Sequence, residues 1–502
     1  MAKLLPGTNS AKLDINNVSA VVTPKQNSFD PWWFNDGTRF RAPKSGIANA
    51  VYSSSPWLLA THGGERHASL PAFGGGTSPD GRNDHAGPQA LVMDDAFLER
   101  YHRVWKLDRA QVQAHIAEWN APGYTMPEAI ASWPGNGDES NGEPAQLAPF
   151  ADLNANGVYE PQQGEYPVIK GDQAVYAITH TNDRFDLYGG TLQSLPFDLH
   201  IMHYSFHDDG DHALDHTVFV NYKYVNRSAL LFTDIRYGQY ADIDIGNPDD
   251  DFAGCDSIRN MFFAYNWDDN DETTISGLGY GNQPPALGVR FLSQPLRSHR
   301  SIPSAGPELV TLDDAMYGLW YGAPFTQLGY PTHFQYPGGS FIEQQITLAT
   351  PDRRSVGATG PFTLGPGDTL CMDLAFIYAR AASGGAYASV EALKLRADSV
   401  QAAYDVFNTG CTSYPSMVGI KERQDAPSLL LYPNPARTHL TVQVDAHIQE
   451  LSVLDMQGRI LLQRRPSGKQ VVIDIQHLAS GTYLLRALTQ AGIAARTVVV
   501  EH

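Results

Sequence analysis

The middle of the chain contains a series of segments in which apolar and polar residues alternate. Aromatic and β-branched residues are common in every one of them, and turn residues separate them. Alternation with a period of two is typical of half-buried strands. The segments are QAVYAITH, LPFDLHIMHYSF, HTVFVNYKYVNRS, FTDIRYGQYADIDIG, NMFFAYNW, ALGVRFLS and TLCMDLAFIYARA. We therefore predict a mainly β fold, whose large region is an antiparallel β-sandwich with a few helices.

Three of these strands follow one another closely and are expected to pair. Sequential strands usually lie side by side, so residues 197–206, 217–226 and 232–245 are predicted to be neighbours in one antiparallel sheet. His200 and His203 both lie on the first of them. An odd separation along a strand sends side chains to opposite faces. The two imidazoles therefore cannot bind one ion from that strand.

Two regions have helical rather than strand periodicity. Residues 94–119 carry apolar side chains at helical spacing, and Asp108 is placed to cap a second helix within that region. Residues 389–407 have an apolar face that recurs at helical spacing from Val390 to Phe407. We predict helices near 94–119 and 389–407.

Residues 152–160, DLNANGVYE, have an oxygen-bearing side chain at every second position and a glycine after the third. Calcium binds six to eight oxygens, and a short loop supplies them by curling around the ion. The sequence therefore predicts a Ca²⁺ site in this loop. Its predicted ligands are Asp152, Asn154, Asn156, the carbonyl of Val158, and Glu160 or Glu165.

The loop differs from an EF-hand at the position of the bidentate glutamate, which is Gln163 here. Pro161 and Pro167 disfavour a long helix after the loop. The predicted setting is thus β or irregular. The alternative interpretation is a polar Asn-Gly turn that binds no ion.

A second acidic cluster occupies residues 242–256, DIDIGNPDDDFAGCD. Carboxylates this crowded repel one another unless a cation or water screens them, so a second Ca²⁺ is predicted, with a solvated acidic loop as the alternative. Paired carboxylates also permit a glycoside hydrolase. The candidate ligands are Asp242 and Asp244, which share one side of a strand end, and Asp249, Asp250 and Asp251.

Composition limits the partners and the compartment. The 502 residues include 35 Lys and Arg against 54 Asp and Glu, a net charge of −19, which disfavours nucleic-acid binding. No apolar run reaches the roughly 18 residues that a membrane span requires. The three cysteines, Cys255, Cys371 and Cys411, are too far apart for a CxxC motif. One disulfide is possible, but the sequence does not select the pair.

The end of the chain is a separate module of short alternating strands. Residues 412–427 form a polar linker, and residues 428–502 are predicted to fold as a small Ig-like β-sandwich. The large region is then residues 1–411. The motifs of the module are YPNP at 432–435, LTV at 440–442, VLD at 453–455 with Gly458, ID at 473–474 with Leu478, and GTY at 481–483.

These motifs resemble the type A C-terminal sorting domain of the type IX secretion system of Bacteroidetes. The resemblance implies export to the extracellular space or the outer-membrane surface, with the secretion machinery as the partner of residues 428–502. It also implies a signal peptide. The N-terminal sequence MAKLLPGTNSAKLD lacks the apolar segment of one, so we expect it to be absent from this chain.

The large region resembles an uncharacterised group of exported proteins that carry this tail. The matching stretches include YHRVWK at 101–106, the DLNANGVYEP loop, NYKYVNRS at 221–228 and QYADID at 239–244. No activity comes with this resemblance. It leaves the function to be argued from the residues.

Three functions are weighed. The first is a calcium-stabilised structural or adhesive protein without enzymatic activity, because no GxSxG, HExxH or phosphate-loop motif occurs. Its partners would be a surface glycan or other copies of itself. The second is a glycan-binding module, and the third is a secreted glycoside hydrolase that uses the acidic cluster. The aromatic side chains considered for stacking on sugars are Trp32, Trp33, Trp57 and Trp320.

Overall fold

The chain forms two compact units, Met1–Pro415 and Ser416–His502. The computed structural model describes residues 10–30, 37–71, 86–181, 193–207, 213–303, 340–342, 352–407, 429–444, 447–454, 460–466, 468–489 and 492–501. The predicted linker at 412–427 lies outside these described residues.

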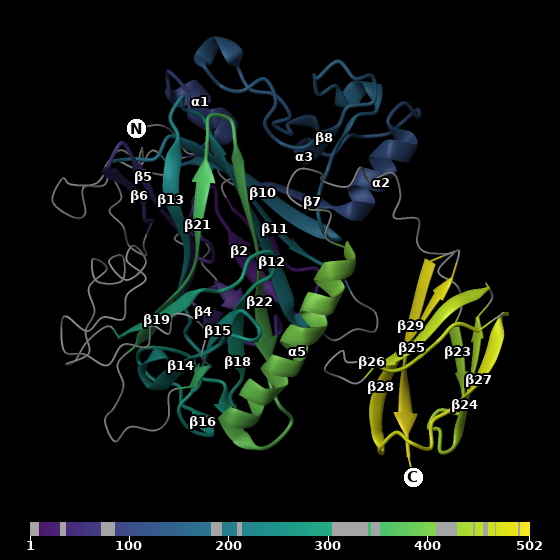
Figure 1. Ribbon diagram of the computed structural model, residues 1–502. Coiled ribbons are helices and arrows are strands. Elements are labelled where there is room, and N and C mark those ends of the chain that lie inside the picture. The colour runs from purple at the N-terminus through teal and green to yellow at the C-terminus, as the bar shows by residue number, and fades with distance from the viewer. Residues whose placement is uncertain are drawn as a thin grey trace. The chain divides into compact units, whose positions relative to one another are not determined.

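The large unit is built on a nine-stranded antiparallel sheet (Figure 1). It contains most of the strands that the alternating pattern predicts. In spatial order its strands are β20 (Phe341–Ile342), β14 (Asp251–Asp256), β15 (Met261–Asn266), β18 (Ala286–Phe291), β22 (Thr369–Ala379), β12 (Thr217–Asn226), β11 (Phe197–Ser205), β10 (Gln173–His180) and β7 (Trp105–Asp108).

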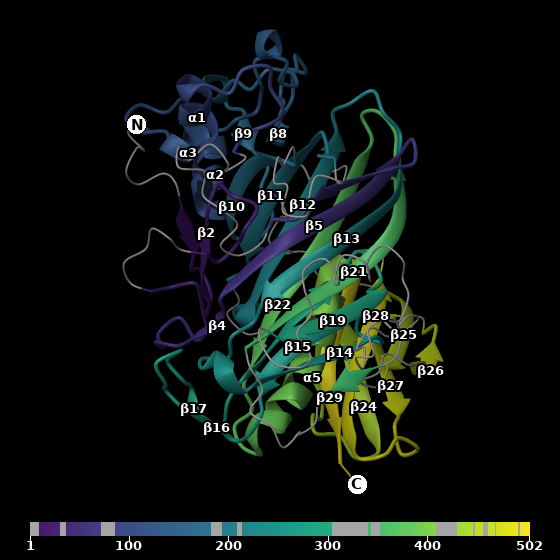
Figure 2. The same cartoon turned by 90° about the vertical axis from the view of Figure 1, so that its left-hand side faces the viewer.

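A five-stranded antiparallel sheet forms the second layer of the sandwich (Figure 2). Strand β13 is at its centre and pairs with β21 on one side and β5 on the other. In spatial order the strands are β19 (Ser298–Pro303), β21 (Arg353–Leu364), β13 (Phe232–Asp242), β5 (Ser53–His62) and β6 (Glu65–Ser69).

The apolar core lies between these two sheets. Alternate residues of β11 and β12, such as Ile201 and Val220, point into it from one side. Ile235 and Tyr237 of β13 point into it from the other. The predicted mainly β fold with an antiparallel sandwich is therefore confirmed.

Smaller sheets surround the sandwich. A four-stranded sheet near the N-terminus consists of β1 (Ala11–Leu13), β2 (Ser19–Val22), β3 (Phe40–Arg41) and β4 (Asn49–Val51). Two two-stranded ladders are β8 (Phe150–Ala151) with β9 (Tyr166–Pro167), and β16 (Asn270–Asp271) with β17 (Gly281–Asn282).

The helices are few in the described part of the chain, as predicted. The α-helices there are α1 (Asp95–Tyr101), α2 (Arg109–Glu118), α3 (Glu128–Ala131) and α5 (Gly385–Phe407). The 3₁₀ turns are η2 (Glu139–Asn141), η3 (Pro161–Gln163), η4 (Leu214–His216) and η5 (Pro248–Asp250). Within the described residues, no helix is long and apolar enough to cross a membrane.

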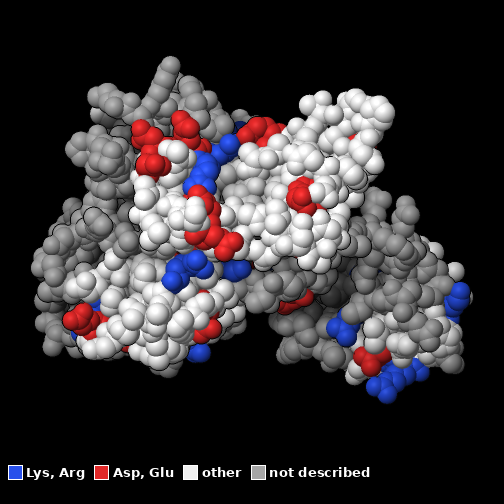
Figure 3. Space-filling model, turned by 90° about the horizontal axis from the view of Figure 1, so that it is seen from above, with Lys and Arg blue, Asp and Glu red and all other residues white. Residues whose placement is uncertain are grey.

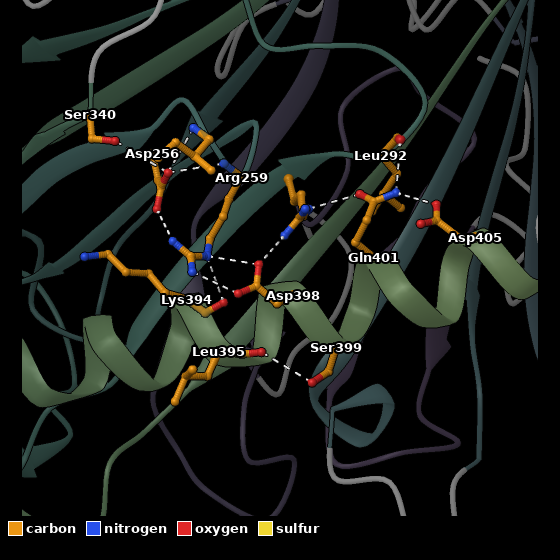
Figure 4. A network of polar contacts seen from close by, with 12 residues as sticks. Asp256, Arg259, Leu292, Ser340, Lys394, Leu395, Asp398, Ser399, Gln401 and Asp405 are labelled. Carbon is orange, nitrogen blue, oxygen red and sulfur yellow. Dashed lines mark hydrogen bonds and ion pairs between the residues drawn. The ribbon is translucent and has the colours of Figure 1, made fainter. Parts of the chain in front are cut away.

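Helix α5 lies against the nine-stranded sheet and packs on β22, β18 and β15 (Figure 1). Its apolar face, which includes Val390, Leu393 and Val400, is fully buried. A polar clamp adds to this packing. Arg259 donates to Asp256 Oδ2 at 2.8 Å and to both carboxylate oxygens of Asp398 on the helix at 2.8 and 3.0 Å (Figure 4). The clamp therefore joins the helix to the β14–β15 turn.

The C-terminal unit is a small sandwich of a three-stranded and a four-stranded antiparallel sheet. The first holds β23 (Leu429–Tyr432), β24 (His439–Val444) and β27 (Gln470–Asp474); the second holds β26 (Ile460–Arg464), β25 (Ile448–Leu454), β28 (Gly481–Thr489) and β29 (Gly492–Val500). Asn434 of the YPNP motif accepts the N–H of Val499 at 2.8 Å. That contact ties the start of the module to its last strand.

Two details of the sequence prediction are wrong. Strands β11 and β12 pair as expected, but β13 lies in the facing sheet and not beside β12. The chain crosses between layers after Asn226, whose side chain holds the turn by donating to the carbonyls of Leu230 and Gly365. In the helical region at 94–119, Asp108 caps the second helix as predicted, but the strand β7, which pairs with β10 and separates α1 from α2, was not predicted.

The structure narrows the possible disulfide pairings. Cys371 in β22 is in a disulfide bond. Cys255 in β14 is a buried thiol, which excludes the two pairings that contain it. Cys411 lies outside the described residues.

The packing of α5 predicts a contrast between two leucines on the same helix. Leu393 is 0% exposed and Leu395 is 66% exposed. Leu393→Ala should lower the free energy of unfolding by about 2–5 kcal/mol, since it removes buried methyl groups and leaves a cavity. Leu395→Ala should change it by less than about 0.5 kcal/mol. Chemical denaturation of both variants measures the difference, and equal losses would contradict the assigned face.

Candidate functional site

The predicted calcium loop lies in the part of the large unit that carries α2, α3 and β8 (Figure 1). The ladder between β8 and β9 pairs Ala151 with Tyr166 and so closes the base of the loop. Residues 153–156 at its tip are exposed. The loop is therefore anchored at its two ends and open to solvent at its tip.

Side-chain oxygens hold the curl of the loop. Asp152 accepts the N–H of Asn156 at 3.2 Å through Oδ1 and the N–H of Gly157 at 2.8 Å through Oδ2. Asn154 Oδ1 accepts the N–H of Asn156 at 3.0 Å, and Asn156 Oδ1 accepts the N–H of Val158 at 2.7 Å. The last two contacts are turns in which a side chain accepts from the backbone two residues on. The three predicted side-chain ligands therefore all turn toward the inside of one loop.

A positive φ at two positions makes the curl possible. Gly157 has a φ of 76°, which glycine adopts without strain, and Ala155 has a φ of 59°. The glycine after the third oxygen-bearing residue is thus needed for the turn, as the sequence pattern indicates.

The two candidate closing acids have different roles. Glu165 is fully buried, and its carboxylate accepts the N–H of Leu153 at 3.0 Å and the N–H of Glu160 at 2.8 Å. It therefore joins the beginning of the loop to its end. Glu160 Oε2 instead accepts the side-chain amides of Asn154 and Asn156 at 3.0 and 2.7 Å. Both acids lie against the loop.

Helix α2 fixes the end of the loop through a buried histidine. His115 Nε2 lies 3.0 Å from the carbonyl oxygen of Glu165, and Nδ1 lies 3.1 Å from the hydroxyl of Tyr124. Burial lowers the pKa of His115, against the opposing effect of the Glu165 carbonyl. A neutral imidazole with its proton on Nε2 donates to Glu165 and accepts from Tyr124. The histidine therefore positions the backbone of Glu165 without adding charge.

The arrangement suits a cation that takes oxygen ligands. Carboxylate and amide oxygens have more than one lone pair, so an oxygen that accepts an N–H can also bind a metal ion. Val158 lies in the loop and is 49% exposed. Asp152, Glu160 and Glu165 do not approach one another closely enough to form a three-carboxylate group. Any cation held here would therefore need the amide and backbone oxygens as well.

A closer group of carboxylates lies at the end of the β13–β21 ladder. Oxygen atoms of Asp242, Asp244 and Asp352 all lie within 4.8 Å of one another, the one such three-acid group in the described part of the chain. Asp242 faces Arg354 in the ladder. Extending this antiparallel register by two residues places Asp244 opposite Asp352. The group is therefore a cross-strand cluster on one face of the sheet.

Burial dominates the electrostatics of this cluster. It raises the pKa of Asp242 to about 7, with the Asp352 carboxylate adding to the rise and the Arg354 guanidinium opposing it. Burial raises the pKa of Asp244 well above its usual value, and the neighbouring Asp242 adds to this. Arg354 Nε lies 3.6 Å from Asp242 Oδ2, and Arg354 Nη2 donates to Asp352 Oδ2 at 3.3 Å.

The other three acids predicted for this site have separate partners. Asp249 accepts the hydroxyl of Ser276 at 2.6 Å, and Asp250 accepts the side-chain amide of Asn247 at 2.9 Å. Asp251 accepts the N–H of Ile245 at 2.7 Å. The structure therefore brings Asp242 and Asp244 together but groups them with Asp352 and not with residues 249–251.

Sequence reasoning missed Asp352. It is far from Asp242 in the chain, and the residues around it, ATPDRRSV, carry no metal-binding pattern. The signal that identifies it is the strand register, which appears only once β21 is known to pair with β13.

Positive and negative side chains are mixed on the face seen from above (Figure 3). Ion pairs between residues 100 and 143 of the chain include Arg100 with Glu143 and Arg103 with Glu128, each at 2.6 Å. Of the tryptophans considered for sugar stacking, Trp57 is buried and stacks on Tyr240 at a ring distance of 5.3 Å. The other three, Trp32, Trp33 and Trp320, lie outside the described residues.

Comparison with known proteins bears on the tail. Residues 430–501 match the family described as the secretion system C-terminal sorting domain. The tail is a type IX sorting domain, so the protein is exported to the cell surface or the extracellular space. A search of curated proteins finds no match.

Among solved structures, a polysaccharide lyase is similar at 8% identity with a TM-score of 0.20. The alignment covers 60% of this chain and 34% of the lyase, so it spans about a third of the lyase's length. At that TM-score the likeness indicates neither a shared fold nor a shared activity.

The two-unit organisation predicts that export depends on the C-terminal unit, whereas the large unit folds without it. Deleting residues 416–502 should abolish export, because the sorting signal is lost, and should leave the melting temperature of the large unit unchanged. Fractionation of cells that express the full-length and truncated proteins, together with thermal melts, measures both effects. Normal export of the truncated protein would contradict the sorting role.

Proposed function

We propose that the protein is a calcium-stabilised structural or adhesive protein of the cell surface or extracellular space. The proposal starts from export, because the sorting tail directs the protein out of the cell. Extracellular modules bind Ca²⁺ with dissociation constants of roughly 10⁻⁴–10⁻³ M. A partly exposed loop with two to three carboxylates and several neutral oxygens suits that range.

The observation that carries the proposal is the inward turn of Asp152, Asn154 and Asn156. These oxygens lie at the first, third and fifth positions of the loop, the positions that ligate calcium in short loops. Glu165 is held at the closing position by contacts from both ends of the loop. A loop already curled by its own hydrogen bonds loses little conformational entropy when it binds an ion.

The hydrolase alternative receives little support from the acidic cluster. Glycoside hydrolases hold two carboxyl groups about 5–9.5 Å apart on either side of a scissile bond. One oxygen of Asp242 lies within 4.8 Å of one oxygen of Asp244, and the Asp242 side chain is 4% exposed. A carboxylate as buried as Asp242 is poorly placed to act on a sugar from solvent.

Removal of calcium should lower the stability of the large unit. At an ion concentration a hundredfold above the dissociation constant, binding adds about 2.7 kcal/mol to the free energy of unfolding, or about 3 °C in melting temperature for a unit of this size. Thermal melts with calcium and with a chelator measure the shift. Asp152→Ala should remove the part of the shift that the loop provides.

The matched control is Glu118→Gln, which removes one exposed carboxylate from the neighbouring helix α2 without touching the loop. It should retain the full calcium-dependent shift. If Asp152→Ala also retains the full calcium-dependent shift, the predicted calcium site in this loop is wrong, and the polar Asn-Gly turn is the correct interpretation.

The adhesive role needs its own test. Full-length protein should bind a surface glycan or other copies of itself in a calcium-dependent way, and Asp152→Ala should weaken that binding. A glycan array tests the alternative function, glycan binding. Saturable binding of one glycan class would favour a glycan-binding module over a structural protein.

A further inference from the structure

We propose that Asp242, Asp244 and Asp352 bind one divalent cation, with Ca²⁺ as the ion of choice. The proposed site lies at the end of the β13–β21 ladder, away from the loop at 152–165. It does not rest on the function proposed above. Its occupation would tie the end of β13 to the start of β21.

The spacing of the cluster fits one shared ion. Two oxygens bound to the same Ca²⁺ at about 2.4 Å can lie no more than about 4.8 Å apart. One carboxylate oxygen from each of Asp242, Asp244 and Asp352 satisfies this limit toward the other two. Three aspartates supply hard oxygen donors and no nitrogen or sulfur, which favours Ca²⁺ over zinc or copper.

A second observation, independent of the clustering, comes from hydrogen bonding. The Asp242 side chain is 4% exposed, and among the described residues no donor reaches its Oδ1 atom. The same holds for Oδ1 of Asp244 within the described part of the chain. Buried carboxylate oxygens almost always have a partner, because leaving one unsatisfied costs several kcal/mol. A bound cation would supply the partner that both oxygens lack.

Neighbouring residues add a further oxygen on the same face. Strand β5 flanks β13 on the edge away from β21, and its Ser53 is the cross-strand partner of Asp242. The two side chains therefore lie on the same face of the sheet. The Ser53 hydroxyl is also buried, and no hydrogen-bond partner for it occurs among the described residues. It is therefore available as a neutral ligand or as a donor to a water molecule on the ion.

The local electrostatics are also compatible with a bound cation. Arg354 contacts the Oδ2 atoms of Asp242 and Asp352. Burial disfavours the charged forms of Asp242 and Asp244, and a divalent cation would offset that cost.

The test counts ions on the full-length protein. Metal-free protein is titrated with Ca²⁺ by calorimetry and by equilibrium dialysis, and variants are compared. The wild type should bind two ions, one in the loop and one in the cluster. Asp352→Asn should bind one, because the change removes a charge but keeps the side-chain size. The double variant Asp152→Ala, Asp352→Asn should bind none.

Asp249→Asn is the matched control, since Asp249 is an exposed acid of the same acidic stretch and lies outside the cluster. It should bind two ions. Asp244→Asn serves as a second probe of the cluster and should weaken that site by roughly tenfold or more, as its charge count falls. Circular dichroism and thermal melts establish that each variant is folded.

The two proposals fail in different ways. If Asp352→Asn and Asp244→Asn bind as many ions as Asp249→Asn with equal affinity, the cluster takes up no cation and this inference is overturned. If Asp152→Ala keeps both ions while Asp352→Asn loses one, the cluster site stands and the loop assignment is the one that is wrong.

Discussion

The large unit depends on the burial of one face of strand β13 against the nine-stranded sheet. Ile235, Tyr237 and Ala241 supply that face. Side chains alternate along a strand, so Tyr240 and Asp242 must lie on the opposite face. A slip of one residue would move a carboxylate into the apolar core and expose the core residues. The register of β13 is therefore strongly determined, and with it the position of Asp242 between β5 and β21.

The two candidate cation sites are built in different ways. The loop draws its oxygens from one short segment, and its own side chains hold its backbone in a curl. The cluster draws its carboxylates from two strands, and only the β13–β21 ladder brings them together. A local site is mostly formed before it binds an ion. A cross-strand site instead depends on the whole sheet, and an ion in it would stabilise strand pairing.

The tertiary context also explains where local patterns misled. Residues 105–108 sit within a stretch of helical periodicity, yet they form β7 because pairing with β10 outweighs weak helical propensity. The prediction that β13 pairs with β12 followed the preference of sequential strands to be neighbours. In a sandwich, however, a chain can satisfy its core by crossing to the facing sheet, and the turn at Asn226 directs that crossing.

The sequence alone determined the features that depend on short-range pattern. Alternation identified the strands and the antiparallel sandwich, the motifs of the last 75 or so residues identified the sorting domain, and the spacing of Asp152, Asn154, Asn156 and Gly157 identified a curled loop. These are local properties, in which each residue acts on neighbours along the chain. Only the tertiary structure decided which sheet β13 joins, that Glu165 closes the loop, and that Asp352 joins Asp242. The first and last of these depend on contacts between residues distant in sequence, which burial and strand register select and no single segment encodes.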